Sequence, residues 1–158
     1  MKKRALIIVL VAVIAFAVFN TVWFAWSRST YGKLSDGMEA AEFNTVFDRR
    51  YFYSDAERYD YSVKYPNYLS FTGNMSVGIP TTGDNPFTDA LIIWPKLTGG
   101  YELGALLYDE DGTGYSVYID EKGNALSVED EDVVLRHSDN IRILLIKADE
   151  RWGIFDPN

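Results

Sequence analysis

The sequence predicts an α+β protein: an N-terminal transmembrane helix, then a small domain in which an antiparallel meander sheet is covered by a helix before it and by a C-terminal helix. Three observations predict this class. An uninterrupted apolar run opens the chain, apolar and polar residues alternate over its middle, and apolar residues recur at three- and four-residue steps near its end. This order is typical of helices that cover one face of an antiparallel sheet.

Composition and charge exclude several classes of function. The 158 residues carry a net charge of −8, with no cysteine and a single histidine, His137. A disulfide framework, a cysteine nucleophile and a cysteine-ligated metal are therefore excluded. Residues 1–28 carry four bases and no acid, whereas residues 29–158 carry 11 bases and 23 acids, a net charge of −12. This acidic part would repel phosphate, so no nucleic acid is expected as a partner.

The first element is a candidate transmembrane helix over residues 5–26. A basic tail at residues 1–4 precedes it, and Trp23 and Trp26 mark its far end as an interfacial belt does. A helix of these 22 residues is about 33 Å long, enough for a hydrocarbon core of about 30 Å. The lipid bilayer of the cell membrane is thus an expected partner. The basic tail predicts a cytoplasmic N-terminus and places residues 30–158 outside the cytoplasm.

A cleaved signal peptide is the alternative interpretation of this segment. The basic start, the apolar stretch and the small-x-small pattern at residues 15–17 fit it, and the mature protein would then be secreted. Cleavage after Ala17 would leave an apolar, tryptophan-containing start on a soluble chain, and the apolar run continues well beyond that point. These two features favour an uncleaved signal-anchor.

The segment after the anchor predicts a linker and then a helix. Residues 27–35 are polar enough for a short linker, and the extracytoplasmic domain is predicted over residues 36–158. Ser35 is a candidate N-cap, and apolar residues at helical spacing predict a helix over residues 36–51. Its apolar face is expected to pack on the sheet that follows.

The middle of the chain predicts antiparallel strands. Tyrosines alternate with polar residues over residues 59–65, and apolar residues keep one parity over residues 69–79. A short apolar run at residues 90–94 predicts a buried strand. A proline follows each of these segments, which is where a strand is expected to end.

The clearest local signal is a hairpin around Asp111-Gly112, between strand-like residues 101–109 and 113–120. Asp-Gly favours a two-residue type I′ turn, because both of its positions need positive φ. A second turn at residues 121–124 completes a three-stranded meander. The two-residue turn would place Tyr108 opposite Tyr115 and would put these side chains on the core face: Leu106, Tyr108, Tyr115, Val117 and Ile119.

Residues 128–152 predict the C-terminal helix. Ser127 begins a capping-box pattern, a run of acids follows where the helix dipole favours them, and Gly153 ends the apolar periodicity. A break is expected near residues 138–140, where a new N-cap is available. The apolar run from residue 141 to 146 also fits a buried strand, although its helical spacing favours the helix. His137 lies on the apolar side, which favours a core or partly buried histidine over a ligand.

Acids around the hairpin suggest a cation site. Residues 109–120 match an EF-hand loop by spacing, but Thr113 and Asp120 are not the usual ligands and the flanks predict strands. In the hairpin, Asp109 and Asp120 would lie six strand residues apart, roughly 20 Å, too far for one ion. The hairpin therefore excludes the EF-hand. Asp109 and Asp111 remain as candidate ligands of a looser Ca²⁺ site, and no other cofactor is expected.

Tyrosines are the strongest candidates for a partner surface. Six of them lie between residues 51 and 68, and exposed aromatic residues anchor protein interfaces. Tyr51, Tyr53, Tyr59 and Tyr61 are therefore candidate partner-binding residues. The alternative is that β-propensity and core packing account for them.

Together these features predict a single-pass, membrane-anchored extracytoplasmic interaction domain that binds a protein partner at the membrane surface. An extracytoplasmic cation or small-ligand sensor is the alternative, and a cell-envelope hydrolase is less favoured. No diagnostic spacing of catalytic carboxylates is recognised, and no catalytic residue is assigned, which favours a non-enzyme.

Overall fold

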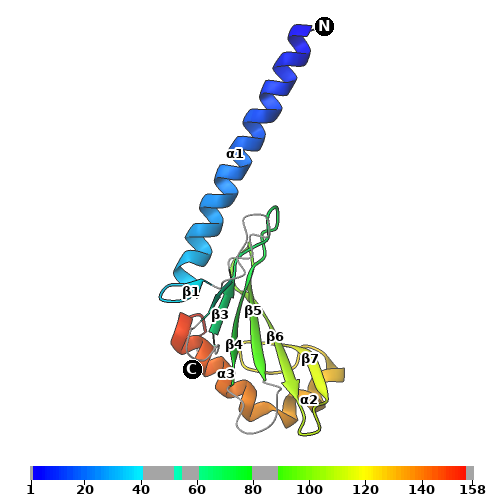
Figure 1. Cartoon of the computed structure of the whole chain (residues 1–158). Helices are drawn as coiled ribbons and strands as arrows, with labels where there is room; N and C mark the ends of the chain where they lie inside the picture. The colour runs from blue at the N-terminus through cyan, green and yellow to red at the C-terminus, as the bar shows by residue number, and fades with distance from the viewer. Residues whose placement is uncertain (1, 41–51, 55–60, 80–88, 156–158) are drawn as a thin grey trace.

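The computed structural model describes residues 2–40, 52–54, 61–79 and 89–155, and it begins with a long helix that projects from a sheet-based domain (Figure 1). Helix α1 (Lys2–Leu34) is followed by β1 (Glu39–Ala40), β2 (Phe52–Ser54), β3 (Tyr61–Lys64), β4 (Asn74–Gly78), β5 (Ala90–Pro95), β6 (Tyr101–Tyr108) and β7 (Gly114–Ile119). A 3₁₀ turn, η1 (Val128–Asp130), then leads into α2 (Glu131–Arg136) and α3 (Ser138–Trp152). This order confirms an α+β chain with an N-terminal apolar helix and C-terminal helices.

The strands form one antiparallel sheet in chain order, from β1 to β7, which confirms the predicted meander. One face of this sheet packs against α2 and α3, and the end of α1 adds to the same core (Figure 1). The residues of the core are Tyr31, Val63, Tyr65, Met75, Val77, Leu91, Ile93, Leu103, Ala105, Leu107, Val117, Ile119, Val134, Ile141, Leu144 and Ala148.

Three successive chain reversals at the β5–β7 side of the sheet share one loop geometry. They span residues 96–100, 109–113 and 120–124, and in each the first N–H donates to the carbonyl of the fifth residue. The fourth residue is always a glycine with positive φ, at 90° for Gly99, 85° for Gly112 and 84° for Gly123. This is the hairpin loop of three residues that ends in a left-handed glycine.

The loop of three residues corrects the predicted register of β6 against β7. Tyr108 pairs with Gly114, not with Tyr115, because the loop holds one residue more than the predicted type I′ turn. A shift of one residue turns the side chains of β6 to the other face. The buried residues of the hairpin are therefore Leu103, Ala105 and Leu107 on β6, in place of the predicted Leu106 and Tyr108, with Val117 and Ile119 on β7 as predicted.

Helix α1 replaces the predicted linker. Residues 27–35 are helical through Leu34, so the helix runs without a break from its apolar segment into the domain. Ser35, the predicted N-cap, instead follows the last helical turn, and its hydroxyl lies 3.0 Å from the hydroxyl of Tyr65. Residues 27–34 pack against the loop between β3 and β4, as described below, and this packing stabilises the helix there.

The predicted helix over residues 36–51 is wrong at its start. Gly37 has φ of 74°, a left-handed conformation that ends helices, and residues 39–40 form β1 against β2. The remainder of that prediction, residues 41–51, lies outside the described residues. The predicted strand over residues 69–79 begins only at Asn74, where β4 starts.

The C-terminal helix is confirmed in three pieces. The Ser127 hydroxyl accepts a hydrogen bond from the N–H of Glu129, and Gly153 ends α3 with φ of 59°. The break falls at His137, which ends α2 and caps α3, directly before the predicted region. Ile141 lies in α3, so the strand alternative for this run is wrong.

Candidate functional site

The first half of α1 is a fully exposed apolar rod. All side chains from residue 3 to residue 18 are exposed, and Leu6 and Ile8, for example, keep 69% and 68% of their surface. By length and composition the helix is able to cross a membrane, and a signal sequence has the same properties. An apolar surface of this extent needs a partner other than water.

The second half of α1 packs on the loop between β3 and β4, residues 65–73, called here the β3–β4 loop. Trp23 keeps 3% of its surface and Tyr31 none. The indole N–H of Trp23 donates to the carbonyl of Ser70 at 2.7 Å, and the N–H of Gly73 donates to the hydroxyl of Tyr31 at 2.8 Å. Burial raises the pKa of Tyr31, and the Gly73 hydrogen bond opposes this shift.

Aromatic rings line the contact between α1 and the β3–β4 loop. They meet mostly edge to face at centroid separations that favour ring pairs. The Tyr68 hydroxyl adds a hydrogen bond of 2.6 Å to the side-chain carbonyl of Asn20. The ring pairs are Phe19–Phe71 at 6.3 Å, Trp23–Tyr68 at 5.6 Å, Trp26–Phe71 at 5.5 Å, Trp26–Tyr31 at 6.0 Å and Tyr31–Tyr65 at 5.5 Å.

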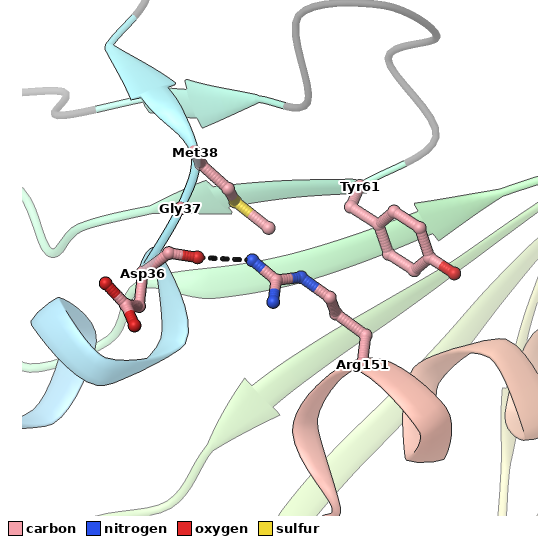
Figure 2. Close-up of a pocket in the computed structure, with 5 residues that line it drawn as sticks. All are labelled: Asp36, Gly37, Met38, Tyr61 and Arg151. Atoms are coloured by element: carbon pink, nitrogen blue, oxygen red, sulfur yellow. Dashed lines mark hydrogen bonds between the residues drawn. The ribbon is translucent and has the colours of Figure 1, made fainter.

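Side chains at the end of α3 donate hydrogen bonds to the end of α1 and to the turn after it. The indole N–H of Trp152 donates to the carbonyl of Leu34 at 3.0 Å, and the guanidinium of Arg151 donates to the carbonyl of Asp36 (Figure 2). The last carbonyls of a helix lack partners within it, so the Trp152 indole satisfies one that would otherwise need water. The Arg151 hydrogen bond holds the turn that follows the helix. The domain is therefore held to α1 by packing and hydrogen bonds from two sides.

A small cavity lies beside this junction. Its volume is about 280 Å³, and Figure 2 shows Arg151 reaching across it to Asp36, with Met38 and Tyr61 on its walls. This volume is slightly below the range of about 300–1,000 Å³ that is usual for small-molecule sites. Arg151 already bonds to a backbone carbonyl, and the cavity lies between the turn after α1 at residues 36–38, β3 and α3.

The predicted partner-binding tyrosines fall in different situations. Tyr61 is half-buried, with its ring 5.8 Å from that of Trp152 and the Lys147 ammonium 5.3 Å from its centroid. Tyr53 pairs with Val63 across β2 and β3, but its side chain lies outside the described residues. Tyr51 and Tyr59 also lie outside them. Their role as an interface stays a prediction.

The predicted cation ligands bond within the protein. Asp109 accepts a hydrogen bond from the Tyr115 hydroxyl at 2.9 Å, and its carboxylate lies 3.5 Å from the Arg136 guanidinium. Asp111 accepts from the N–H of Thr113 at 2.9 Å, a bond that lowers the pKa of the Asp111 carboxyl. In the described part of the chain, no three histidine or acidic side chains are grouped to hold a metal ion. The hairpin geometry also excludes the EF-hand loop.

His137 lies between two carboxylates at the end of the domain far from α1. Its Nε2 is 3.0 Å from Asp109 and its Nδ1 is 3.7 Å from Asp89. Asp89 is 8% exposed and also accepts hydrogen bonds from the N–H of Tyr108 at 2.8 Å and from the Asn140 side chain at 2.7 Å. This His137 cluster joins the start of β5, the end of β6 and the α2–α3 junction. The prediction of a core or partly buried histidine is confirmed, since His137 is partly buried, but the carboxylate contacts were not predicted.

The sheet face turned away from α3 carries an aromatic pair. Trp94 and Tyr118 lie 6.3 Å apart on either side of Gly104, and a Cβ on Gly104 would lie 2.9 Å from the Trp94 ring. Tyr118 keeps 51% of its surface, and Ile92 and Leu106 are half-buried on the same face. Sequence reasoning missed this surface, because the two-residue turn assigned Leu106 to the core.

The chain matches no known protein family, no curated protein and no solved structure. Its function is therefore inferred from its own residues. The features from which a function is proposed below are the two halves of α1, the β3–β4 loop and the Trp94–Tyr118 face.

Proposed function

We propose that the chain is a single-pass membrane protein that holds its α+β domain at the extracytoplasmic membrane surface, where the domain binds a protein partner. One observation carries the proposal: α1 is continuous from a fully exposed apolar segment into the core of the domain. A bilayer is the medium that covers such a segment, and the basic residues before it favour a cytoplasmic N-terminus.

The junction supports an uncleaved anchor over a cleaved signal. Phe19, only two residues beyond the candidate cleavage site after Ala17, already contacts the domain through Phe71. The helix that contains this site continues without interruption to Leu34. A hinge would let the domain move freely on its tether, whereas this helix fixes the distance and the orientation of the domain relative to the membrane.

A fractionation experiment tests the anchor. The full chain with a C-terminal tag should remain in the membrane after alkaline carbonate extraction, keep its N-terminus, and lose the domain to protease added from outside. The double variant Leu10→Arg/Ile14→Arg places charge on the exposed apolar half and should prevent stable insertion. A mature N-terminus at residue 18 would contradict the anchor, and full protection of the tag from protease would contradict the orientation.

The Trp94–Tyr118 face is the described surface best suited to the partner. Aromatic side chains supply much of the binding energy at protein interfaces, and here α3 covers only the opposite face of the sheet. The net charge of −12 on residues 29–158 would favour rapid association with a basic partner. The predicted Tyr51, Tyr53 and Tyr59 are proposed as further contributors, whereas Tyr61 packs on Trp152 of α3, on the other face of the sheet.

Site-specific crosslinking tests the proposed face. A photoreactive amino acid at Tyr118, in the full chain in its native membrane, should give one defined adduct that Trp94→Ala weakens. The same group at Leu135, a residue of α2 with 73% of its surface exposed, is the matched control and should give none. Equal labelling from both positions, or an adduct at Tyr118 that Trp94→Ala leaves unchanged, would reject this face as the binding surface.

A further inference from the structure

We infer that the β3–β4 loop inserts its tip into the outer interface of the bilayer, with Leu69 in contact with lipid. The inference rests on the proposed function, because it takes α1 as the membrane-spanning helix. It adds a second membrane contact, made by the domain itself, to the one that α1 provides.

The length of the hydrocarbon core places the loop at membrane depth. A core of about 30 Å takes about 20 helical residues at 1.5 Å each. Counted from Ala5, the first residue after the basic tail, these residues end at Phe24. Asn20 then lies about 6 Å inside the outer boundary and Phe19 about 8 Å inside it. A tilted helix would need more residues to cross, which would place both of them deeper.

Contacts between the β3–β4 loop and α1 place the loop beside Phe19 and Asn20 in the membrane. The ring of Phe71 meets that of Phe19 at 6.3 Å, and the Tyr68 hydroxyl donates to Asn20 at 2.6 Å. These are the contacts of the loop nearest to the N-terminus of α1 among those described. While the domain keeps its packing on α1, the tip of the loop therefore lies close to the hydrocarbon boundary.

Polar groups at this depth are already satisfied within the protein. The Asn20 amide N–H donates to the carbonyl of Phe16 at 2.7 Å, while its carbonyl accepts from Tyr68. The Thr21 hydroxyl donates to the carbonyl of Ala17 at 2.9 Å. Unpaired polar groups are costly in an apolar medium, so this pairing is what a membrane location requires.

Leu69 has the features of a lipid contact. It keeps 58% of its surface exposed and adopts φ of 66°, a left-handed conformation that glycine or asparagine takes more easily. It is the sole non-glycine residue with positive φ in the described part of the chain. Tyr68 and Phe71 beside it keep 39% and 37% of their surface. Aromatic residues around an exposed leucine match the composition of a membrane interface.

Depth-dependent quenching tests the insertion. The chain has no cysteine, so single substitutions carry an environment-sensitive fluorophore in the full chain, reconstituted in vesicles of phosphatidylcholine and phosphatidylglycerol. The variants are Leu69→Cys, Ile14→Cys in α1 and Leu135→Cys, an exposed leucine on α2 at the far end of the domain (Figure 1). The quencher is a spin label attached to a lipid, either near the headgroup or near the end of the acyl chain.

Each outcome has a defined meaning. We expect the Ile14 label to be quenched by the deep label, the Leu69 label to be blue-shifted and quenched by the headgroup-proximal label, and the Leu135 label to show neither effect. If Ile14 is quenched while Leu69 behaves like Leu135, the insertion is overturned and the anchor stands. If Ile14 is not quenched, the anchor itself fails.

A second variant separates lipid contact from folding. With the fluorophore at Asn67→Cys, the further change Leu69→Gly removes the apolar side chain and suits the positive φ, so the loop should keep its fold. We expect quenching at residue 67 to fall while the near-UV circular dichroism is unchanged. Unchanged quenching would show that Leu69 does not hold the loop in the membrane and would overturn the inference.

Discussion

The two halves of α1 belong to one continuous helix and have opposite surroundings. Residues 3–18 are exposed along their whole length, whereas residues 19–34 bury Trp23 and Tyr31 against the β3–β4 loop and the sheet. One helix therefore joins two environments without a hinge. An apolar helical segment does not by itself specify its partner, and here the domain provides it for one half and the proposed bilayer for the other.

The substitution with the largest expected effect in this comparison is Tyr31→Ala. The residue is wholly buried and its hydroxyl binds Gly73, so we expect the domain to lose about 3–5 kcal/mol in its free energy of unfolding, as for other large aromatic truncations. The measurement is urea unfolding of the detergent-solubilised full chain, followed by tryptophan fluorescence.

Two matched variants sharpen that result. Tyr31→Phe removes only the hydroxyl and should cost about 1 kcal/mol. Ile14→Ala in the exposed half should change the stability of the domain by less than about 0.5 kcal/mol, because Ile14 keeps 53% of its surface. A large effect of Ile14→Ala would mean that the two halves do not differ as described.

Alanine substitutions at two glycines should give the next largest changes in stability, with opposite signs. A Cβ on Gly73 would lie 2.2 Å from the carbonyl oxygen of Lys64 and 2.7 Å from the Tyr31 ring, so Gly73→Ala should cost about 3 kcal/mol. A Cβ on Gly32, within α1, would lie 3.7 Å from the Tyr65 hydroxyl, an ordinary contact. Gly32→Ala should therefore stabilise the helix by up to about 1 kcal/mol. The same unfolding assay measures both, and destabilisation by Gly32→Ala would show that the junction is tighter than these distances indicate.

A third comparison uses the opposite end of the domain, where the expected loss of stability is smaller than for Tyr31→Ala and Gly73→Ala. His137→Ala leaves Asp89 and Asp109 without the imidazole and should cost about 2 kcal/mol. Hydrogen exchange should rise in the loop at residues 109–113 and stay unchanged in the β3–β4 loop, whereas Tyr31→Ala should give the reverse pattern. Equal exchange in both loops for both variants would mean that the two ends unfold as one unit.

Local signals predicted the sheet side of the domain well. The chain reversal at Asp111-Gly112, the short strand at residues 90–94, and the ends of the last helix at Ser127 and Gly153 depend on neighbours in sequence. Each was found where it was predicted. The hairpin register was not, because Asp-Gly fits both loop lengths and only the pairing of Tyr108 with Gly114 distinguishes them.

Long-range partners account for the larger misses. Residues 27–35 appear polar, and nothing nearby in sequence reveals that Tyr31 packs on Tyr65 or that Trp152 reaches Leu34. The carboxylates around His137 were not predicted for the same reason, since Asp89 precedes His137 by nearly fifty residues. For Tyr51, Tyr53 and Tyr59 the structure describes no side chain, and their interface role stays a prediction.

The sequence by itself determined the apolar helix, the antiparallel meander and the helical C-terminus, because periodicity and turn residues act over a few positions. Only the tertiary structure decided where α1 leaves the exposed apolar segment and joins the domain. That choice depends on whether each side chain of the helix meets a partner, and the partners come from Ser70, Gly73 and Trp152, which are distant in the chain. Burial of this kind depends on which two surfaces pack against each other, and a local sequence pattern does not specify the surface that the helix will meet.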